Sequence, residues 1–271
     1  MSERRNLKVH IGELGEIRDV MDAMKNLALV ETRKVTNLLA HRQTLARNLE
    51  EVAADFLAYH ALNIEPSADA PVCWIVFGSE RGFCGDYNEA LAEALAGHVN
   101  TDQDVVVPVG TRLGGRLEGP QEYITGAEVS EEVPAILAAL VAKLGAMQAG
   151  TQSLKVHTLH HNPDTRLIEA RQLMPPPWDP GKARGGIAPM LNLDAPAFFS
   201  ELVDRYLFVA LQEIAYAALM AENQKRTQHM SGAVRRLDEK MAELTRHYHI
   251  ERQEEITEEI EVILLTAAEG F

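Results

Sequence analysis

The chain has 271 residues, 46% of them hydrophobic, and its formal net charge of −14 argues against nucleic acid as a partner, because a phosphate backbone attracts basic surfaces. Two cysteines are too few for a disulfide scaffold, so we expect reduced thiols in a cytosolic compartment. A polar start and the lack of a long apolar run argue against a signal peptide and direct membrane insertion, so membrane association is expected to go through partners.

The first predicted element is a long helix within residues 1–62. Apolar residues recur every three or four positions, which is close to coiled-coil spacing, and the segment contains no proline. Glu31 and Arg42 interrupt the apolar stripe. Prolines and small polar residues between positions 63 and 71 predict the end of this helix.

Residues 70–196 have a different pattern. Short apolar runs ended by glycine predict buried strands at 72–77 and 105–109, and helices are predicted at 88–98 and 133–147. A strand pair is predicted at 154–160 and 167–173, around an Asn-Pro-Asp turn. Strands that alternate with helices predict a layered α/β domain with a partly parallel sheet.

Residues 197–271 predict a second long helix, with one internal glycine, Gly232. At about 1.5 Å per residue the two terminal helices would span roughly 85 and 100 Å, while a compact globule of this chain length is roughly 50 Å across. We therefore expect the two helices to pair along their apolar stripes as a rod. A compact helical bundle is the alternative.

The glycine-rich block after the first predicted strand is a candidate site. It lies between a strand and a helix, as a phosphate-binding loop does, but it lacks the Lys-Ser/Thr pair and the spacing of the dinucleotide fingerprint. We interpret it as a tight turn whose backbone is fixed by Arg81 and Asn88, with nucleotide binding as the lesser alternative. The predicted turn residues are Gly78, Arg81, Gly82, Gly85 and Asn88.

No metal site, cofactor or catalytic residue is predicted. His157, His160 and His161 lie close in sequence, but His160 would point away from the other two on a strand. No cysteine or acidic residue has ligand spacing to them. The sequence offers no set of nucleophile, base and orienting residue.

Three blocks of sequence resemble a known family. Residues 20–28 are VMDAMKNLA, residues 78–88 are GSERGFCGDYN and residues 252–260 are RQEEITEEI. In order and spacing they resemble the γ subunit of F-type ATP synthases, which has I-T-x-A-M-x-x-V-A-like, D-R-G-L-C-G-like and R-Q-x-x-I-T-like blocks. The resemblance covers essentially the whole chain.

The resemblance implies a long antiparallel coiled coil with a Rossmann-like domain at its base. The implied function is that of a non-catalytic rotor shaft, which couples ion flow through the membrane rotor to ATP synthesis or hydrolysis. The implied partners are the α and β subunits of the catalytic ring, the ε subunit and the membrane c-ring, at the cytoplasmic face of the plasma membrane.

By the same resemblance, five side chains are expected at the contact with the catalytic-subunit loops. The alternative for all of them is an exposed helix face with ordinary core packing. The expected contact residues are Arg226, Arg252, Gln253, Thr257 and Met24.

The sequence departs from the family pattern at several positions. Asp22, His249 and Thr266 replace the usual lysine, asparagine and glycine, and five glutamates crowd residues 254–261, where the family shaft tends to be basic. These departures predict a divergent branch. Two other functions stay open: a coiled-coil adaptor without a rotary role, and an α/β enzyme whose small-molecule binding Gly82→Val would weaken.

Overall fold

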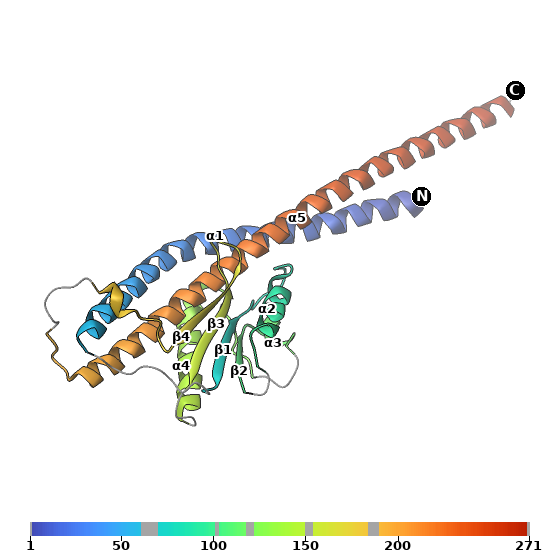
Figure 1. The fold of residues 1–271 in the computed structure, drawn as a ribbon. Coiled ribbons are helices and arrows are strands. Elements are labelled where there is room, and N and C mark those ends of the chain that lie inside the picture. Colours follow the sequence, from blue (N-terminus) through green and yellow to red (C-terminus); the bar gives the residue numbers. More distant parts are fainter. Residues whose placement is uncertain are drawn as a thin grey trace. The chain divides into compact units, whose positions relative to one another are not determined.

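The computed structural model describes residues 2–60, 70–100, 103–117, 122–149, 154–183 and 190–269. One long helix precedes the α/β elements in the sequence, and a second long helix follows them (Figure 1). The elements in order are α1 (Ser2–Tyr59), β1 (Val72–Phe77), α2 (Tyr87–Ala96), β2 (Val105–Val109), α3 (Thr111–Gly114), η1 (Ser130–Glu132), α4 (Val133–Ala149), β3 (Lys155–His161), β4 (Ile168–Met174), η2 (Pro180–Lys182) and α5 (Ala195–Glu269).

The two terminal helices are continuous. α1 has 58 residues and α5 has 75, so they are about 85 and 110 Å long at the usual rise per residue. α5 begins two residues earlier than expected, since Pro196 is tolerated in the first turn of a helix. The expectation of two long uninterrupted helices is confirmed.

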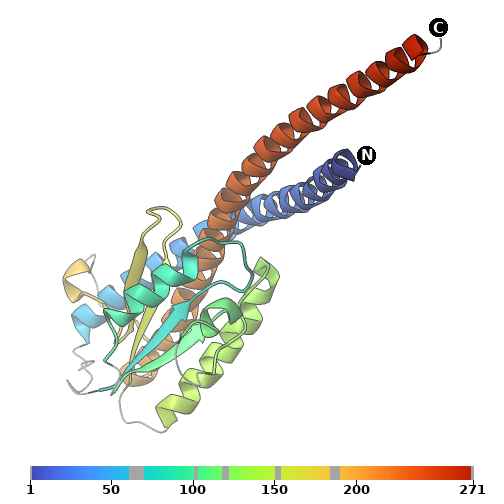
Figure 2. The ribbon, with the colours of Figure 1, turned by 90° about the vertical axis from the view of Figure 1, so that its right-hand side faces the viewer.

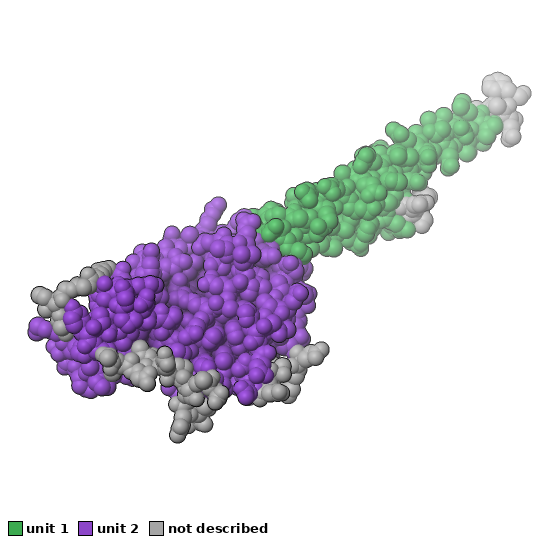
Figure 3. Space-filling view, viewed as in Figure 1, with its two compact units in different colours: residues 1–27, 227–271 green, residues 28–226 purple. Residues whose placement is uncertain are grey.

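The chain divides into two compact units, coloured separately in Figure 3. Unit 1 comprises residues 1–27 and 227–271, and unit 2 comprises residues 28–226. This division differs from the three segments expected from sequence, because residues 28–59 of α1 and 195–226 of α5 belong to the same unit as the α/β elements.

Unit 1 is an antiparallel pair of helices. Arg4 pairs with Glu255 at 2.7 Å, and Arg18 Nε donates to Asp238 Oδ1 at 3.2 Å. Residue numbers rise along α1 as they fall along α5, so the two helices run in opposite directions (Figure 2).

Unit 2 contains a four-stranded sheet in the order β2-β1-β3-β4. β1 pairs in parallel with both β2 and β3, whereas β3 and β4 form an antiparallel pair. β1 is in the middle of the parallel part and is buried along nearly its whole length, which explains its continuous apolar sequence. The predicted partly parallel sheet is confirmed.

Helices cover both faces of this sheet. Alternate residues of β1 point to opposite faces, so they contribute to two different apolar clusters. One face packs against α4 and the unit 2 parts of α1 and α5, and the other packs against α2. The first cluster includes Cys73, Ile75, Phe77, Val35, Leu140 and Leu211, and the second includes Trp74, Val76, Tyr87, Leu91 and Leu159.

The structure explains one interruption of the α1 stripe. Glu31 is only 8% exposed, and its Oε1 accepts a hydrogen bond of 2.6 Å from the backbone N–H of Ser130. Lys34, one turn further on, pairs with Glu131 at 2.5 Å. The glutamate in the apolar stripe therefore binds η1 to α1, and it satisfies a backbone donor just before α4 begins.

Candidate functional site

The glycine-rich turn between β1 and α2 is held by a buried asparagine. Asn88 Oδ1 accepts a hydrogen bond from the backbone N–H of Ser79 at 2.9 Å, and its Nδ2 donates to Ser79 Oγ at 2.8 Å. Both residues are buried. The first turn of α2 thus fixes the chain where it leaves the sheet.

Two glycines in this turn have clear physical reasons, and a third does not. A Cβ on Gly78 would lie 2.3 Å from the Cβ of Leu113, so the close approach of α3 requires glycine there. Gly85 has a φ of +63°, in the left-handed region that favours glycine. A Cβ on Gly82 would meet nothing closer than Arg112 Nη2 at 3.9 Å.

Glu80 is a structural residue that the sequence patterns did not reveal. Its carboxylate accepts hydrogen bonds from the Thr111 backbone N–H at 2.9 Å, from Thr111 Oγ1 at 2.7 Å and from the Gly126 N–H at 2.7 Å. It therefore joins the turn to the start of α3 and to the loop that contains Gly126. The only signal in the sequence was an acidic residue just after the end of a parallel strand.

Arg81 has a different role from the expected one. Its guanidinium forms an ion pair with Glu128, and this contact lowers the pKa of the Glu128 carboxyl. Arg81 therefore links the turn to the segment before η1. Side-chain hydrogen bonds to the turn backbone include those of Asn88, Cys84 and Arg226.

A buried ion pair on α5 completes the turn. Arg226 and Glu222 are 5% and 4% exposed and pair with one another one helical turn apart. Arg226 also donates to the Gly82 carbonyl at 3.3 Å, to Cys84 Sγ at 3.4 Å and to Asn223 Oδ1 at 2.8 Å. Burial raises the pKa of Glu222, while Arg226 acts in the opposite direction.

This position of Arg226 differs from the one we expected. The sequence resemblance assigned it to a surface that contacts a partner, but the structure buries its guanidinium among donors and acceptors of its own chain. The placement argues against a partner contact and for a role in binding α5 to the turn.

The two cysteines are poor candidates for nucleophilic chemistry. Both are buried, and burial raises the pKa of the Cys73 and Cys84 thiols to about 11 in each case. A thiol with such a pKa is protonated at neutral pH, whereas the thiolate is the reactive form.

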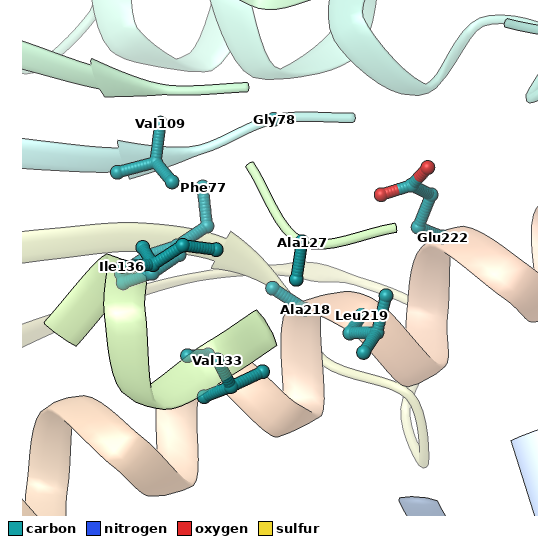
Figure 4. A pocket seen from close by; sticks show the side chains of 10 residues that line it. Phe77, Gly78, Val109, Ala127, Val133, Ile136, Ala218, Leu219 and Glu222 are labelled. Carbon is teal, nitrogen blue, oxygen red and sulfur yellow. The ribbon is translucent and has the colours of Figure 1, made fainter. Parts of the chain in front are cut away.

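A cavity of about 20 Å³ lies behind the turn, between the ends of β1 and β2 and helices α4 and α5 (Figure 4). Apart from the Glu222 side chain its lining is apolar, and its volume is enough for about one water molecule. An open groove of about 640 Å³ on the outer side is lined by three glutamates, Glu80, Glu128 and Glu132. Neither space suits a phosphate group, because one is too small and the other is acidic.

The three histidines have separate environments. His161 Nε2 is 2.9 Å from the Tyr87 carbonyl oxygen, His157 packs against Trp74, and His160 is buried with no hydrogen-bond partner for its Nδ1 among the described residues. No group of three potential metal ligands occurs in the part of the chain that the structure describes.

The remaining expected contact residues lie in unit 1. Arg252, Gln253 and Thr257 are exposed on α5, whereas Met24 on α1 is partly buried. Thr257 Oγ1 donates to the Gln253 carbonyl at 2.9 Å, which places Gln253 and Thr257 on the same face of the helix. The three exposed side chains on α5 are accessible to another molecule.

Across residues 2–60, 70–100, 103–117, 122–149, 154–183 and 190–269, no helix is apolar enough over its length to span a bilayer.

These features define an α/β protein built on two long antiparallel helices, with a turn whose polar groups are bonded within the chain. A family model described as ATP synthase matches residues 3–268, and the chain belongs to this family. Its relatives include the ATP synthase gamma chain of Heliobacterium modesticaldum, with 24% identity over 289 residues and 99% of both chains covered. The gamma chain of Frankia casuarinae is 25% identical, covering 96% of this chain and 95% of the relative.

The same fold occurs in a solved structure. A chain in the Euglena gracilis mitochondrial ATP synthase, solved as OSCP/F1/c-ring in rotational state 3, superposes with a TM-score of 0.65 at 13% identity. The match covers 98% of this chain and 94% of that one. The similarity extends over both long helices and the α/β elements, and at this level of identity it supports the fold alone.

Proposed function

We propose that this chain is the central rotor shaft, the γ subunit, of an F-type ATP synthase, and that it couples ion flow through the membrane rotor to ATP synthesis or hydrolysis. The family match over residues 3–268 is the observation on which the proposal depends. The two uninterrupted helices of 58 and 75 residues suit a shaft, because a continuous helix is stiff along its length.

The proposed mechanism is a shift of conformational populations. A shaft with different side chains on its different faces binds each catalytic subunit differently as it turns. Each subunit then favours the conformation that makes the better contact with the face it meets. The chain needs no catalytic group for this role, and the protonated thiols and acidic groove suit a non-catalytic subunit.

Four side chains of unit 1 are proposed as contacts with the catalytic-subunit loops. Arg252 can make forked hydrogen bonds to carboxylates, while Gln253 and Thr257 can add neutral ones. Met24 would pack close to the same loops. The exposure of the three α5 residues supports this assignment, whereas Arg226 is proposed to hold the β1–α2 turn.

The remaining partners follow from the function. The α and β subunits would form the ring around the shaft, and the c-ring and the ε subunit would join it at the membrane side. The related Euglena chain was solved together with F1 and the c-ring, which supports these two partners. The location would then be peripheral, at the cytoplasmic face of the plasma membrane.

Co-expression with the α and β subunits tests the proposal. The wild-type chain should co-purify with them as an active ATPase. The double substitution Arg252→Ala/Gln253→Ala should lower assembly or the ATP hydrolysis rate several-fold, because it removes charge-assisted contacts. A matched control, Arg205→Ala/Gln148→Ala, removes an arginine and a glutamine from exposed positions of unit 2 and should leave both unchanged. Failure of the wild-type chain to co-purify would contradict the rotor assignment, and normal coupling in the double variant would contradict the assigned contact.

A further inference from the structure

The end of α5, residues 250–266, exposes an unusual amount of apolar surface. Its isoleucine, valine and leucine side chains are between 45% and 65% exposed. Exposed apolar surface of this extent is typical of a site that another molecule covers. The exposed residues are Ile250, Ile256, Ile260, Val262, Ile263, Leu264 and Leu265.

The same segment is strongly acidic. It holds six glutamates and one arginine, whereas the 23 preceding residues of α5, 227–249, hold three acidic and four basic residues. The change of charge is therefore confined to the end of the helix. The glutamates are Glu251, Glu254, Glu255, Glu258, Glu259 and Glu261.

Three glutamates and three isoleucines of this segment lie on nearly opposite faces of the helix. Residues at i, i+4 and i+7 of a helix share one face. One such set is acidic and the other, nearly opposite, is apolar. The acidic stripe is Glu254, Glu258 and Glu261, and the apolar stripe is Ile256, Ile260 and Ile263.

Among the described residues, one of these glutamates forms an ion pair with a basic side chain. Arg4 of α1 pairs with Glu255. The members of the acidic stripe form no ion pair with any residue that the structure describes. A partner that covers the apolar side chains would also take water from the carboxylates, and a carboxylate that loses water without gaining a counter-charge is strongly destabilising.

We propose that the partner surface facing the acidic stripe is basic, with lysine or arginine side chains opposite the glutamates of the stripe and apolar side chains opposite the isoleucines. Arg252 precedes Ile256 by one helical turn and lies on the apolar side, so its proposed carboxylate contacts are separate from this basic surface. The inference rests on the proposed function, in which the ring of α and β subunits encloses this part of the shaft. An acidic surface opposite the stripe would instead place like charges together and weaken the complex.

The test compares two variants that change the net charge equally. The measured quantity is the dissociation constant of the full-length chain for the ring of α and β subunits from the same complex, as a function of KCl concentration. Circular dichroism checks that both variants keep their helices. The stripe variant is Glu254→Gln/Glu258→Gln/Glu261→Gln, and the control is Glu93→Gln/Glu122→Gln/Glu201→Gln, which lies in unit 2.

Wild-type binding should weaken as salt rises, since salt screens attraction between opposite charges. The stripe variant should bind about tenfold more weakly at low salt, with a flatter salt dependence, while the control matches the wild type. The single charge reversal Glu258→Lys should weaken binding further than Glu258→Gln.

Two results would overturn the inference. If the stripe variant binds as tightly as the wild type with the same salt dependence, or binds more tightly, the ring surface is not basic, while the shaft function stands. If the wild-type chain does not bind the ring at all, the shaft function fails, and the inference fails with it.

Discussion

Replacing Asn88 with alanine should strongly destabilise unit 2. The side chain makes two hydrogen bonds to Ser79, at 2.9 Å to its N–H and 2.8 Å to its Oγ, and both residues are buried. Each buried polar group that loses its partner costs about 1–3 kcal/mol, so the free energy of unfolding should fall by about 2–4 kcal/mol.

Urea unfolding of the full chain, followed by circular dichroism, measures this loss. Asn37→Ala, at an exposed position of α1, is the matched control and should change the free energy of unfolding by less than about 0.5 kcal/mol. Ser79→Ala in the Asn88→Ala background should cost less than it does alone, because the bond between the two side chains is already gone. A change below about 0.5 kcal/mol for Asn88→Ala, or strict additivity of the two substitutions, would refute this reasoning.

Two further predictions concern packing and protonation. Gly78→Ala should cost about 2–3 kcal/mol in urea unfolding because its Cβ would overlap a leucine of α3, whereas Gly82→Ala should cost less than about 1 kcal/mol; equal effects would contradict the packing argument. Burial lowers the pKa of His160 from 6.5 to about 4, so the folded state keeps this imidazole neutral while the unfolded state protonates it. Protonation of His160 in the unfolded state therefore lowers the free energy of unfolding as pH falls from about 6.5 towards 4, by about 3 kcal/mol in total. Above about pH 6.5 this loss is absent. His160→Leu should remove about that much of the pH dependence between pH 7 and 4.5, and an unchanged pH profile would count against the burial argument.

The long helices and the sheet were predictable because their signals are local. Both terminal segments lack proline in their helical interiors, and the strands at Val72–Phe77 and Val105–Val109 are short apolar runs ended by glycine. The strand pair Lys155–His161 and Ile168–Met174 lies within one residue of its predicted bounds, because the Asn-Pro-Asp turn fixes where it reverses.

The polar contacts of unit 2 were not predictable, because each joins residues far apart in the chain. Glu31 accepts from Ser130, and Glu80 accepts from Gly126, partners that no local pattern identifies. Arg226 shows the same limit. In the sequence pattern of α5, Arg226 cannot be told apart from the other charged residues of the helix. Only the fold brings the Gly82 carbonyl to its guanidinium.

The buried contacts of Arg226 have a mechanical consequence for α5. This helix continues without a break from Ala195 to Glu269, so a twist applied about its axis at one end is transmitted through its backbone hydrogen bonds. At Arg226 the helix is bonded to the Gly82 carbonyl and to Cys84 by directional contacts, which resist turning more than apolar packing does. A twist of α5 would therefore load the β1–α2 turn at Arg226 in addition to the apolar packing between α5 and the sheet.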